Sequence, residues 1–455
     1  MVDAPHTLAW QPRREGVRVP WGTQQLDLVL PADWPVFDAR PAAAPQPADS
    51  LAQQCESAMS SPLRSPALRQ IARDLAAGGR PIRVAIVVDD DTRPTPADQI
   101  LPIVLDHLGA GRQIPDDRIE IHFAGGMHTP MTRVQMIAKI GPALVERFAC
   151  FNNPFCQPSQ QRFLGRTRHN IAVHLSTRVA DANLRILVGS VSAHLQAGFS
   201  GGYKLLFPGM AGLATIKQLH LRGTERFRQL IGLPADHNPM RQEIDRLGEW
   251  LDGTTFALTL LPGESATQPL AVAAGDPVAV QRTLAEQAVA RYGVHVPGPA
   301  DLVVCNSHPR DNDLWQGFKC IANTLFAARE GGLIVATIKA DRGANGMKLP
   351  RWTLKAKTVR TILKLTGRDG FLHLLARLLP QVNDEARFFV RFGLGTIRRN
   401  DLLIYSPTLA AESVRFPGIE LFDTLPAVWK RAGELLAGRT PNVTVFSQGG
   451  ICYPM

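Results

Sequence analysis

The chain has 455 residues, a length typical of two or three domains, and its 45% hydrophobic and 20% charged residues are ordinary for a soluble globular protein. A net charge of +10 suits binding to nucleic acid, to an acidic membrane surface or to anionic small molecules. Dispersed arginines, 7% aromatic residues and the lack of a recognised binding motif argue against nucleic acid as the partner. No run approaches the ~18–20 apolar residues that cross a bilayer, which excludes a membrane-spanning helix.

The cysteines show no CxxC or CxxxC spacing, so they predict no zinc or iron–sulfur site, and we expect them to be reduced thiols. The first residues, MVDAPHTLAWQPRREG, contain no apolar signal core. We therefore expect a cytoplasmic protein. The six cysteines are Cys55, Cys150, Cys156, Cys305, Cys320 and Cys452.

The first half of the chain begins with a parallel βαβ pattern. After an expected edge strand at Gln24 to Leu30, the run Arg83 to Val88 is typical of a strand covered on both faces. A helix from Ala97 to Leu108 and a strand from Ile119 to Phe123 follow it. This order predicts a parallel sheet, in which ligands bind at the carboxyl ends of the strands.

The pattern continues with a helix expected at Thr132 to Phe148 and strands at Ile171 to Leu175 and Leu184 to Val188. Gly223 to Glu243 is polar and contains two prolines, so we expect a connecting segment there. A strand at Thr254 to Leu261 comes next.

A second α/β unit begins with the apolar strand Asp301 to Cys305 and includes a strand at Leu402 to Tyr405. We predict two α/β domains with mainly parallel sheets and a cleft between them. The expected bounds are residues 1–275 for the N-terminal domain and 276–420 for the C-terminal domain, with the tail, 421–455, returning to the first domain.

The stretch from Gly189 to His220, GSVSAHLQAGFSGGYKLLFPGMAGLATIKQLH, follows a buried strand and contains a glycine-rich turn. Such a turn brings backbone N–H groups together and can hold an anion, and Lys204 adds a positive charge or an amine nucleophile. A glycine-rich turn of this kind is often only structural, and the two histidines of the stretch have ordinary surface or core roles as alternatives. Composition and spacing alone predict a site here without its chemistry.

Four motifs that occur together in a fixed order are more specific than the glycine-rich turn alone. The central stretch has the form SVxxHxxAGxSGGxKxxxPG, and the upstream loops contain DDxTRP, at Asp90 to Pro94, and GxHxPMT, at Gly126 to Thr132. A further match is WQGFK, at Trp315 to Lys319. With these motifs the chain resembles the nickel-pincer lactate racemase family, from about Trp21 to about Lys319.

The resemblance implies a cofactor and a role for each matching residue. The cofactor is a Ni(II)-pyridinium-3,5-bisthiocarboxylate mononucleotide, covalently attached at Lys204, with His220 as the protein ligand to nickel. His128 and His194 are then the catalytic acid–base pair, and the first domain is the cofactor-binding and catalytic one. Further cofactor contacts are expected from Asp90, Asp91, Thr92, Arg93, Ser200, Gly201 and Gly202, and substrate contacts from Arg93, Gln316 and Lys319.

The implied reaction is racemisation or epimerisation at C2 of a 2-hydroxy acid. The C2 hydrogen leaves as hydride while a base takes the hydroxyl proton, and return of hydride to the other face inverts the centre. Substrate candidates are lactate and other 2-hydroxy acids, and the expected partners are the small-molecule substrate and the proteins that make the cofactor, without nucleic acid or membrane.

The chain departs from the family pattern near the expected substrate. Ala193 replaces a frequent proline, Trp315 replaces a frequent tyrosine, and an expected Asp-x-Trp element has only Asp384-Glu385-Ala386 as a candidate. Two alternatives stay open. One is a nucleotide-dependent 2-hydroxy acid dehydrogenase, although SGGYK lacks GxGxxG spacing, and the other is a non-catalytic binder of a phosphorylated ligand.

Overall fold

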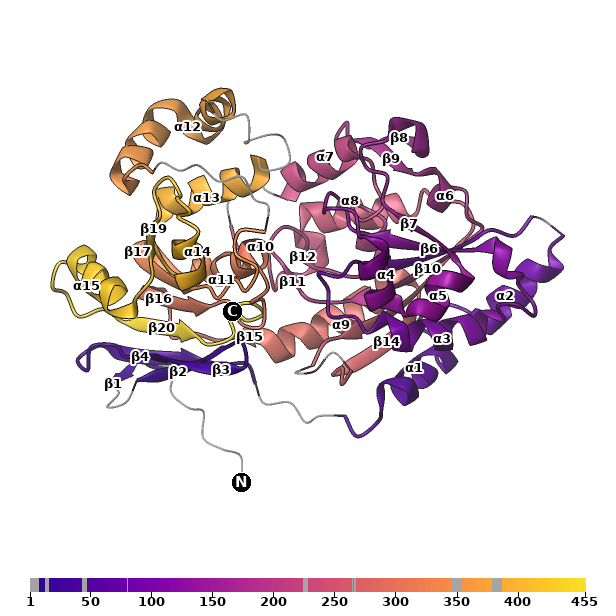
Figure 1. Cartoon of the computed structure of the whole chain (residues 1–455), viewed down its shortest axis with the longest axis horizontal. Helices are drawn as coiled ribbons and strands as arrows, with labels where there is room; N and C mark the ends of the chain where they lie inside the picture. The colour runs from indigo at the N-terminus through magenta and orange to yellow at the C-terminus, as the bar shows by residue number, and fades with distance from the viewer. Residues whose placement is uncertain are drawn as a thin grey trace. The chain divides into compact units, whose positions relative to one another are not determined.

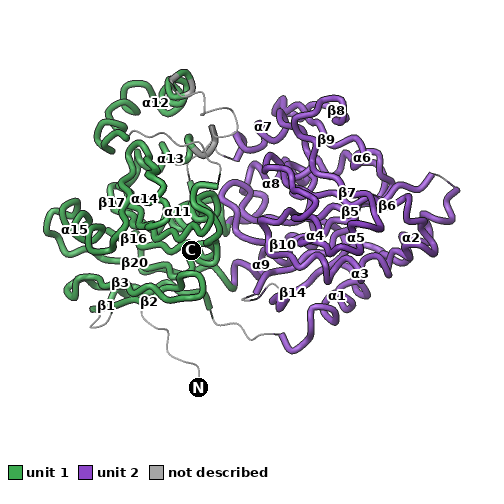
Figure 2. Tube along the Cα trace, in the orientation of Figure 1, with its two compact units in different colours: residues 1–43, 226–232, 291–455 green, residues 44–225, 233–290 purple. Residues whose placement is uncertain are grey.

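The computed structural model describes residues 8–12, 16–42, 47–79, 81–223, 228–263, 265, 267–345, 353–378 and 387–455. The chain forms two compact units (Figure 2). Unit 1 comprises residues 1–43, 226–232 and 291–455, and unit 2 comprises residues 44–225 and 233–290. Each contains one large, mainly parallel sheet with helices, which confirms the predicted α/β class.

Unit 2 is built on a six-stranded sheet, in which only the pair β13–β14 is antiparallel. Strands β6, β7, β10 and β14 of this sheet are labelled in Figure 1. The central strands β5 and β10 are buried along their whole length because their sequences, VAIVVD and LRILVGS, present apolar side chains to both faces. The strand order is β14 (Ala271–Gly275), β13 (Thr254–Leu261), β10 (Leu184–Ser190), β5 (Val84–Asp89), β6 (Ile119–Ala124) and β7 (Ala149–Asn152).

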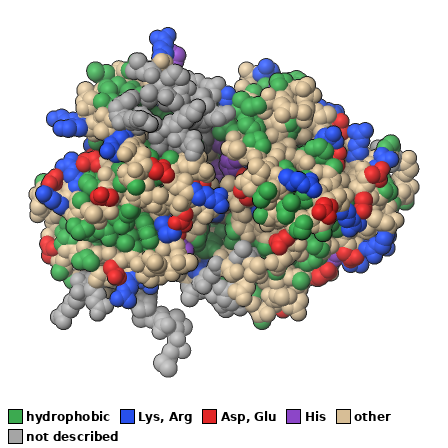
Figure 3. Space-filling view, viewed as in Figure 1, with side chains coloured by type: hydrophobic (Ala, Val, Ile, Leu, Met, Phe, Trp, Pro, Cys, Tyr) green, Lys and Arg blue, Asp and Glu red, His purple; other side chains and the backbone are tan. Residues whose placement is uncertain are grey.

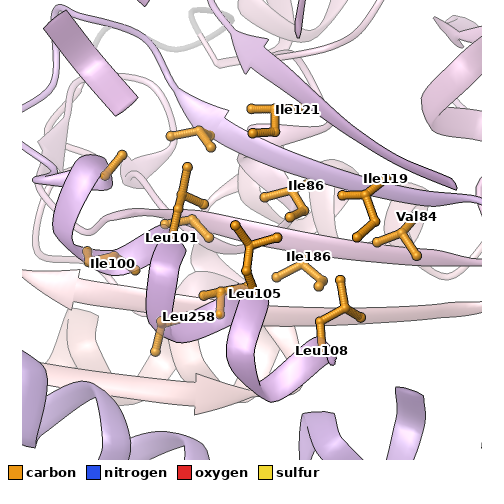
Figure 4. Packing of buried hydrophobic residues seen from close by; sticks show 14 of the residues in the cluster. Val84, Ile86, Ile100, Leu101, Leu105, Leu108, Ile119, Ile121, Ile186 and Leu258 are labelled. Atoms are coloured by element: carbon orange, nitrogen blue, oxygen red, sulfur yellow. The ribbon is translucent and has the colours of Figure 1, made fainter. Parts of the chain in front are cut away.

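The core of unit 2 lies between this sheet and helix α3 (Ala97–Leu108). Ile86 of β5 and Ile186 of β10 belong to the same buried cluster as Leu101 and Leu105 of α3 (Figure 4). The remaining helices are α1 (Leu51–Ser60), α2 (Leu68–Ala77), α4 (Arg133–Ile140), α5 (Pro142–Arg147), α6 (Thr177–Ala180), α7 (Leu213–Gly223), α8 (Pro239–Gly248) and α9 (Pro277–Tyr292). Two hairpins complete the unit, β8 (Gln161–Arg166) with β9 (Ala172–Ser176) and β11 (Ala193–His194) with β12 (Gly198–Phe199).

Two local predictions for this unit are wrong. The single helix expected from Thr132 to Phe148 is two helices, α4 and α5, because Gly141 between them has φ +86°, a left-handed value that breaks the helix. The segment from Gly223 to Glu243, expected to be a connection, contains the start of α8, whose first turn is capped by Asn238.

Unit 1 is built on a seven-stranded sheet that joins the two ends of the chain. Its strand order is β1 (Gln11–Pro12), β4 (Pro35–Ala39), β20 (Val443–Phe446), β16 (Ala300–Asn306), β17 (Ala328–Thr337), β18 (Asp401–Tyr405) and β19 (Glu420–Phe422). The expected return of the tail to the first domain is corrected here, because β20 pairs in parallel with β16 and with β4. The domain division also differs, since residues 1–43 belong to unit 1.

The other elements of unit 1 are helices and short strand pairs. The strand pairs are β2 (Val17–Trp21) with β3 (Gln24–Leu28), a separate hairpin where an edge strand was expected, and β15 (Gly293–Val294) with β21 (Tyr453–Pro454). The helices are α10 (Leu314–Gly317), α11 (Lys319–Thr324), α12 (Ala356–Leu378), which is kinked at Gly367, α13 (Arg387–Arg399), α14 (Pro407–Ala411) and α15 (Leu425–Leu436).

The surface in Figure 3 shows Lys and Arg side chains dispersed among Asp and Glu over the visible face. Within the part of the chain that the structure describes, no helix has both the length and the apolar content needed to cross a membrane.

Candidate active site

Three loops of unit 2 meet at the carboxyl ends of its central strands. They follow β5, β6 and β10, and backbone hydrogen bonds join two of them directly. The N–H of Gly126, after β6, donates to the carbonyl oxygen of Gly209, in the stretch after β10 (2.9 Å). Asn153 Nδ2 donates to the carbonyl oxygens of Gly126 (3.1 Å) and Ala211 (2.9 Å). The predicted convergence of these loops is confirmed.

Asp90 is the buried centre of the loop after β5. Its Oδ1 accepts a hydrogen bond from the Thr92 hydroxyl (2.6 Å), and its Oδ2 pairs with Nδ1 of His128. Burial by itself raises the pKa of this carboxyl group, but the hydrogen bond and charge of His128, the charge of Arg93 and the Thr92 hydroxyl outweigh it and hold the pKa well below its usual range. Asp90 is therefore an acceptor, so the neutral form of His128 carries its proton on Nδ1 and a lone pair on Nε2.

The other two predicted residues of this loop point in different directions. Asp91 is exposed, and its carboxylate accepts a hydrogen bond from Gln135 Nε2 of α4 (2.8 Å). Arg93 is partly buried, and its Nη1 donates to the Thr92 hydroxyl (2.7 Å). Arg93 and Asp90 thus share Thr92 as a neighbour, whereas Asp91 is directed to the helix.

Lys139 holds the same loop from within the protein and was missed by the sequence reasoning. Its side chain, 6% exposed, forms an ion pair with Asp89 (2.9 Å) and donates to the carbonyl oxygens of Arg93 and Thr95 (both 3.0 Å). Thr95 Oγ1 donates to the same Asp89 carboxylate (2.5 Å). A lysine in a predicted helix normally faces solvent, so the sequence contained no signal for this role.

His194 lies in the short hairpin β11–β12 and is partly buried. Its Nδ1 accepts hydrogen bonds from the backbone N–H groups of Gln196 (3.3 Å) and Ala197 (3.1 Å). Because Nδ1 accepts, the ring proton of neutral His194 is on Nε2. His128 and His194 therefore present opposite hydrogen-bonding characters at Nε2, an acceptor on the first ring and a donor on the second.

The glycine-rich turn is held in a conformation that only glycine adopts easily. Gly201 and Gly202 have φ of +83° and +59°, and a Cβ on Gly202 would lie 2.7 Å from the carbonyl oxygen of Pro277. Ser200 is buried, and its hydroxyl donates to the carbonyl oxygen of Ser190 at the end of β10 (2.8 Å). The Ser200 hydroxyl thus fastens the turn to the sheet.

Lys204 and His220 both have environments that favour their neutral forms. Burial, followed by the charges of Arg93 and Arg241, lowers the pKa of Lys204 to about 7. Burial also lowers the pKa of His220 to about 4, while its Nδ1 lies 2.7 Å from the carbonyl oxygen of Ile216. Nδ1 therefore carries the proton of His220, and Nε2 carries the lone pair that a metal ion requires.

No group of three or more His, Cys, Asp and Glu side chains that could hold a metal ion occurs among the residues that the structure describes. Neutral imidazole and neutral amine fit the cofactor that the family resemblance implies, because both act as donors of an electron pair.

Gln316 and Lys319 lie in unit 1, at α10 and the start of α11. Asp313 caps α10 by accepting from the backbone N–H of Gln316 (2.9 Å), and Lys319 Nζ donates to Gln316 Oε1 (2.5 Å). The two side chains thus meet, as their spacing predicted. The candidate Asp384-Glu385-Ala386 lies outside the described residues.

Comparison with known proteins agrees with these features. Residues 21–230 match the family model of the lactate racemase N-terminal domain, a range that contains three of the four motifs. Lactate racemase of Thermoanaerobacterium thermosaccharolyticum is 24% identical over 318 residues, 68% of this chain and 73% of that protein. Lactate racemase of Lactiplantibacillus plantarum is 32% identical over 165 residues, 36% of this chain and 37% of that protein.

Two solved structures share the fold. The lactate racemase apoprotein of Thermoanaerobacterium thermosaccharolyticum superimposes with a TM-score of 0.78 at 18% identity, covering 97% of this chain and 100% of that chain. A Thermotoga maritima protein superimposes with a TM-score of 0.59 at 17% identity, covering 88% and 98% of the respective chains. The N-terminal family model and the related sequences show that this chain is similar to lactate racemases, and the solved structures show that it shares their fold.

Proposed function

We propose that this chain is an isomerase that inverts C2 of a 2-hydroxy acid, with lactate or another 2-hydroxy acid as its substrate. The related proteins are named lactate racemase, and the family is therefore one of isomerases. The observation that carries the proposal is the opposite character of two ring nitrogens. Nε2 of His128 is ready to accept a proton, and Nε2–H of His194 is ready to donate to an oxygen.

The chemistry requires this asymmetry. Removing hydride from C2 leaves a planar 2-keto acid only if a base takes the hydroxyl proton at the same time. His128 takes that proton on Nε2, and the Asp90 carboxylate stabilises the imidazolium that forms. His194 donates to the substrate oxygen from the other face. For the opposite enantiomer the two rings would exchange roles, which requires the proton of His194 to move from Nε2 to Nδ1, so that Nδ1 no longer accepts from Gln196 and Ala197.

Lys204 and His220 are proposed to hold the nickel-pincer nucleotide. When bound, this cofactor supplies the hydride acceptor. Lys204 would form a carbon–nitrogen bond to a thiocarboxylate carbon with loss of one water, a step without change of oxidation state, and the lowered pKa of its amine favours the nucleophilic form. His220 would offer Nε2 to nickel while Ile216 holds its Nδ1 proton.

The remaining predicted residues complete the proposal. Arg93 is proposed to bind the substrate carboxylate and to contact the cofactor, and Gln316 and Lys319 are proposed to bind the substrate. Cofactor contacts are assigned to the loop Asp90–Thr92 and to the turn Ser200–Gly202, whose backbone N–H groups suit a phosphate. Proteins that synthesise the cofactor are required partners under this proposal.

The first test uses protein purified from cells that make the pincer cofactor. We expect nickel in the protein, a nucleotide-sized adduct on the peptide that contains Lys204, and interconversion of the enantiomers of a 2-hydroxy acid in a chiral screen. Lys204→Ala should lack the adduct. An unmodified Lys204 without nickel, beside a control racemase loaded in the same cells, would overturn the proposal and favour a binder of a phosphorylated ligand.

The second test separates the histidine roles from other chemistries. His128→Ala and His194→Ala should each abolish turnover while the adduct on Lys204 is retained. A substrate deuterated at C2 should be racemised with most of its label kept, whereas rapid loss of label to solvent would indicate proton abstraction. Net NADH formation from a hydroxy acid would instead identify a dehydrogenase.

A further inference from the structure

We propose that α8 braces the glycine-rich turn, and that Arg241 on this helix is the positioning residue that sets Lys204 for attachment of the cofactor. The proposal rests on the function proposed above. It assigns a role to a segment that the sequence indicated only as a connection, and to a buried cation that none of the four motifs contains.

Arg241 is 1% exposed, and its guanidinium is directed at the backbone of the turn. Nη1 donates to the carbonyl oxygen of Gly201 (3.3 Å), and Nη2 donates to that of Phe199. These two carbonyls flank Ser200, and Lys204 follows three residues after Gly201. One planar side chain therefore holds the turn on both sides of the serine that fastens it to the sheet.

The charge of Arg241 is only partly balanced within the protein. Its Nη1 lies 3.5 Å from Asp245, and the same carboxylate is shared with Arg282. Its Nε is a buried donor without a hydrogen-bond partner. Burying a charged group in this way costs free energy that an apolar side chain of similar volume would avoid, so packing alone does not account for an arginine here.

The amino-terminal end of α8 is also tied to the two candidate histidines of the stretch. Asn238, which caps α8, donates from Nδ2 to the carbonyl oxygen of Gln196 (3.0 Å). Gln196, 2% exposed, donates from Nε2 to the carbonyl oxygen of His220 (3.2 Å) and from its backbone N–H to Nδ1 of His194 (3.3 Å). One helix end thus connects the segments that carry His194, Lys204 and His220.

The turn gains from an external brace because glycine leaves its backbone many accessible conformations. Gly201 and Gly202 have positive φ where the chain enters a short 3₁₀ helix, Gly202–Leu205, which contains Lys204. Hydrogen bonds from a rigid helix hold such a backbone in one conformation, which fixes the direction in which Lys204 leaves it. The nearby charge of Arg241 also helps to lower the pKa of Lys204, after the larger effect of burial and that of Arg93.

The experiment compares Arg241→Met and Arg241→Lys with wild type and with the control Arg246→Met, a partly exposed arginine of the same helix. Each protein is expressed with the cofactor-synthesising proteins, and the modified fraction of the Lys204 peptide is followed by mass spectrometry over time. We expect loading roughly ten- to a hundredfold slower in Arg241→Met, intermediate in Arg241→Lys, and unchanged in Arg246→Met. Thermal unfolding of each apoprotein identifies variants that do not fold.

Loading at the wild-type rate in either folded Arg241 variant would overturn the proposal, so a methionine variant that fails to fold leaves the lysine variant to decide. If Lys204 is unmodified in wild type as well, the proposed function fails. Amide hydrogen exchange of the apoprotein then tests separately whether Arg241 holds the turn in one conformation. Faster exchange at residues 199–204 in Arg241→Lys supports it, and exchange equal to wild type refutes it.

Discussion

Asp90→Asn is the substitution that most directly tests the proposed pairing of Asp90 with His128. The Thr92 hydroxyl donates to Oδ1 of Asp90 (2.6 Å), so an asparagine would keep its single amide oxygen at Thr92 and turn its NH₂ group toward His128. Nδ1 of His128 would then accept, and its proton would move to Nε2. The ring would lose the lone pair with which it takes the substrate proton.

The expected loss is large because the wrong tautomer cannot act as a base. In a comparable histidine–carboxylate arrangement the same exchange lowers kcat by about 10⁴-fold, so we expect a loss of roughly 10³- to 10⁴-fold, or about 4–5.5 kcal/mol of transition-state stabilisation. For racemisation the loss of kcat/KM must be equal in both directions. The two enantiomers have equal free energies, so the ratio of their kcat/KM values is fixed.

The assay is chiral chromatography of each enantiomer with the loaded variant, normalised to the modified fraction of Lys204. Glu56→Gln is the matched control, since Glu56 pairs with His107 (2.7 Å) between α1 and α3, and its kcat should stay within about twofold of wild type. A loaded Asp90→Asn enzyme that keeps more than a tenth of wild-type kcat would refute the assignment of His128 as a base held by Asp90.

Three further predictions concern stability and are measured on the apoprotein. Ile186→Ala, in the fully buried core of unit 2, should lower the free energy of unfolding in denaturant by about 2–5 kcal/mol, and a loss under 1 kcal/mol would contradict the packing described. Gly202 and Gly79 both have a positive φ (+59° and +65°), so replacing either by alanine should cost about 1–2 kcal/mol of stability. Only the new side chain at position 202 would also meet a carbonyl oxygen at 2.7 Å, so Gly202→Ala should lower the free energy of unfolding more than Gly79→Ala does. Equal losses of stability in the two variants would refute the clash. Burial lowers the pKa of His122 below its ordinary value of 6.5, so as the pH falls the unfolded chain takes up a proton before the folded protein does, and the stability decreases. His122→Phe should therefore flatten the decline of Tm between about pH 7.5 and about pH 5.5. An unchanged slope would show that His122 does not titrate in this way.

Local sequence patterns were sufficient for the framework of the site. The buried strands β5 and β10 were predicted from continuous apolar runs, and the rule for parallel sheets placed the loops of Asp90 and His128 and the glycine-rich turn at one edge. The structure joins these loops by hydrogen bonds, as in the pair Asp90–His128. Apolar runs and turn residues report on the residues around them, which is why these features were readable from the sequence.

Contacts between distant segments were decided only by the tertiary structure. The place of β20 beside β16 and β4 follows from pairing across most of the chain, which no local periodicity encodes. Lysine and arginine usually lie at the protein surface, yet the fold buries Lys139 and Arg241 and directs both side chains at the carbonyl oxygens of loops that are remote in sequence. The sequence by itself determined the buried strands of the sheets and the glycine-rich turn, whereas the packing of the segments determined which charged side chains hold the site together, because a buried cation is stable only where the fold supplies acceptors for it.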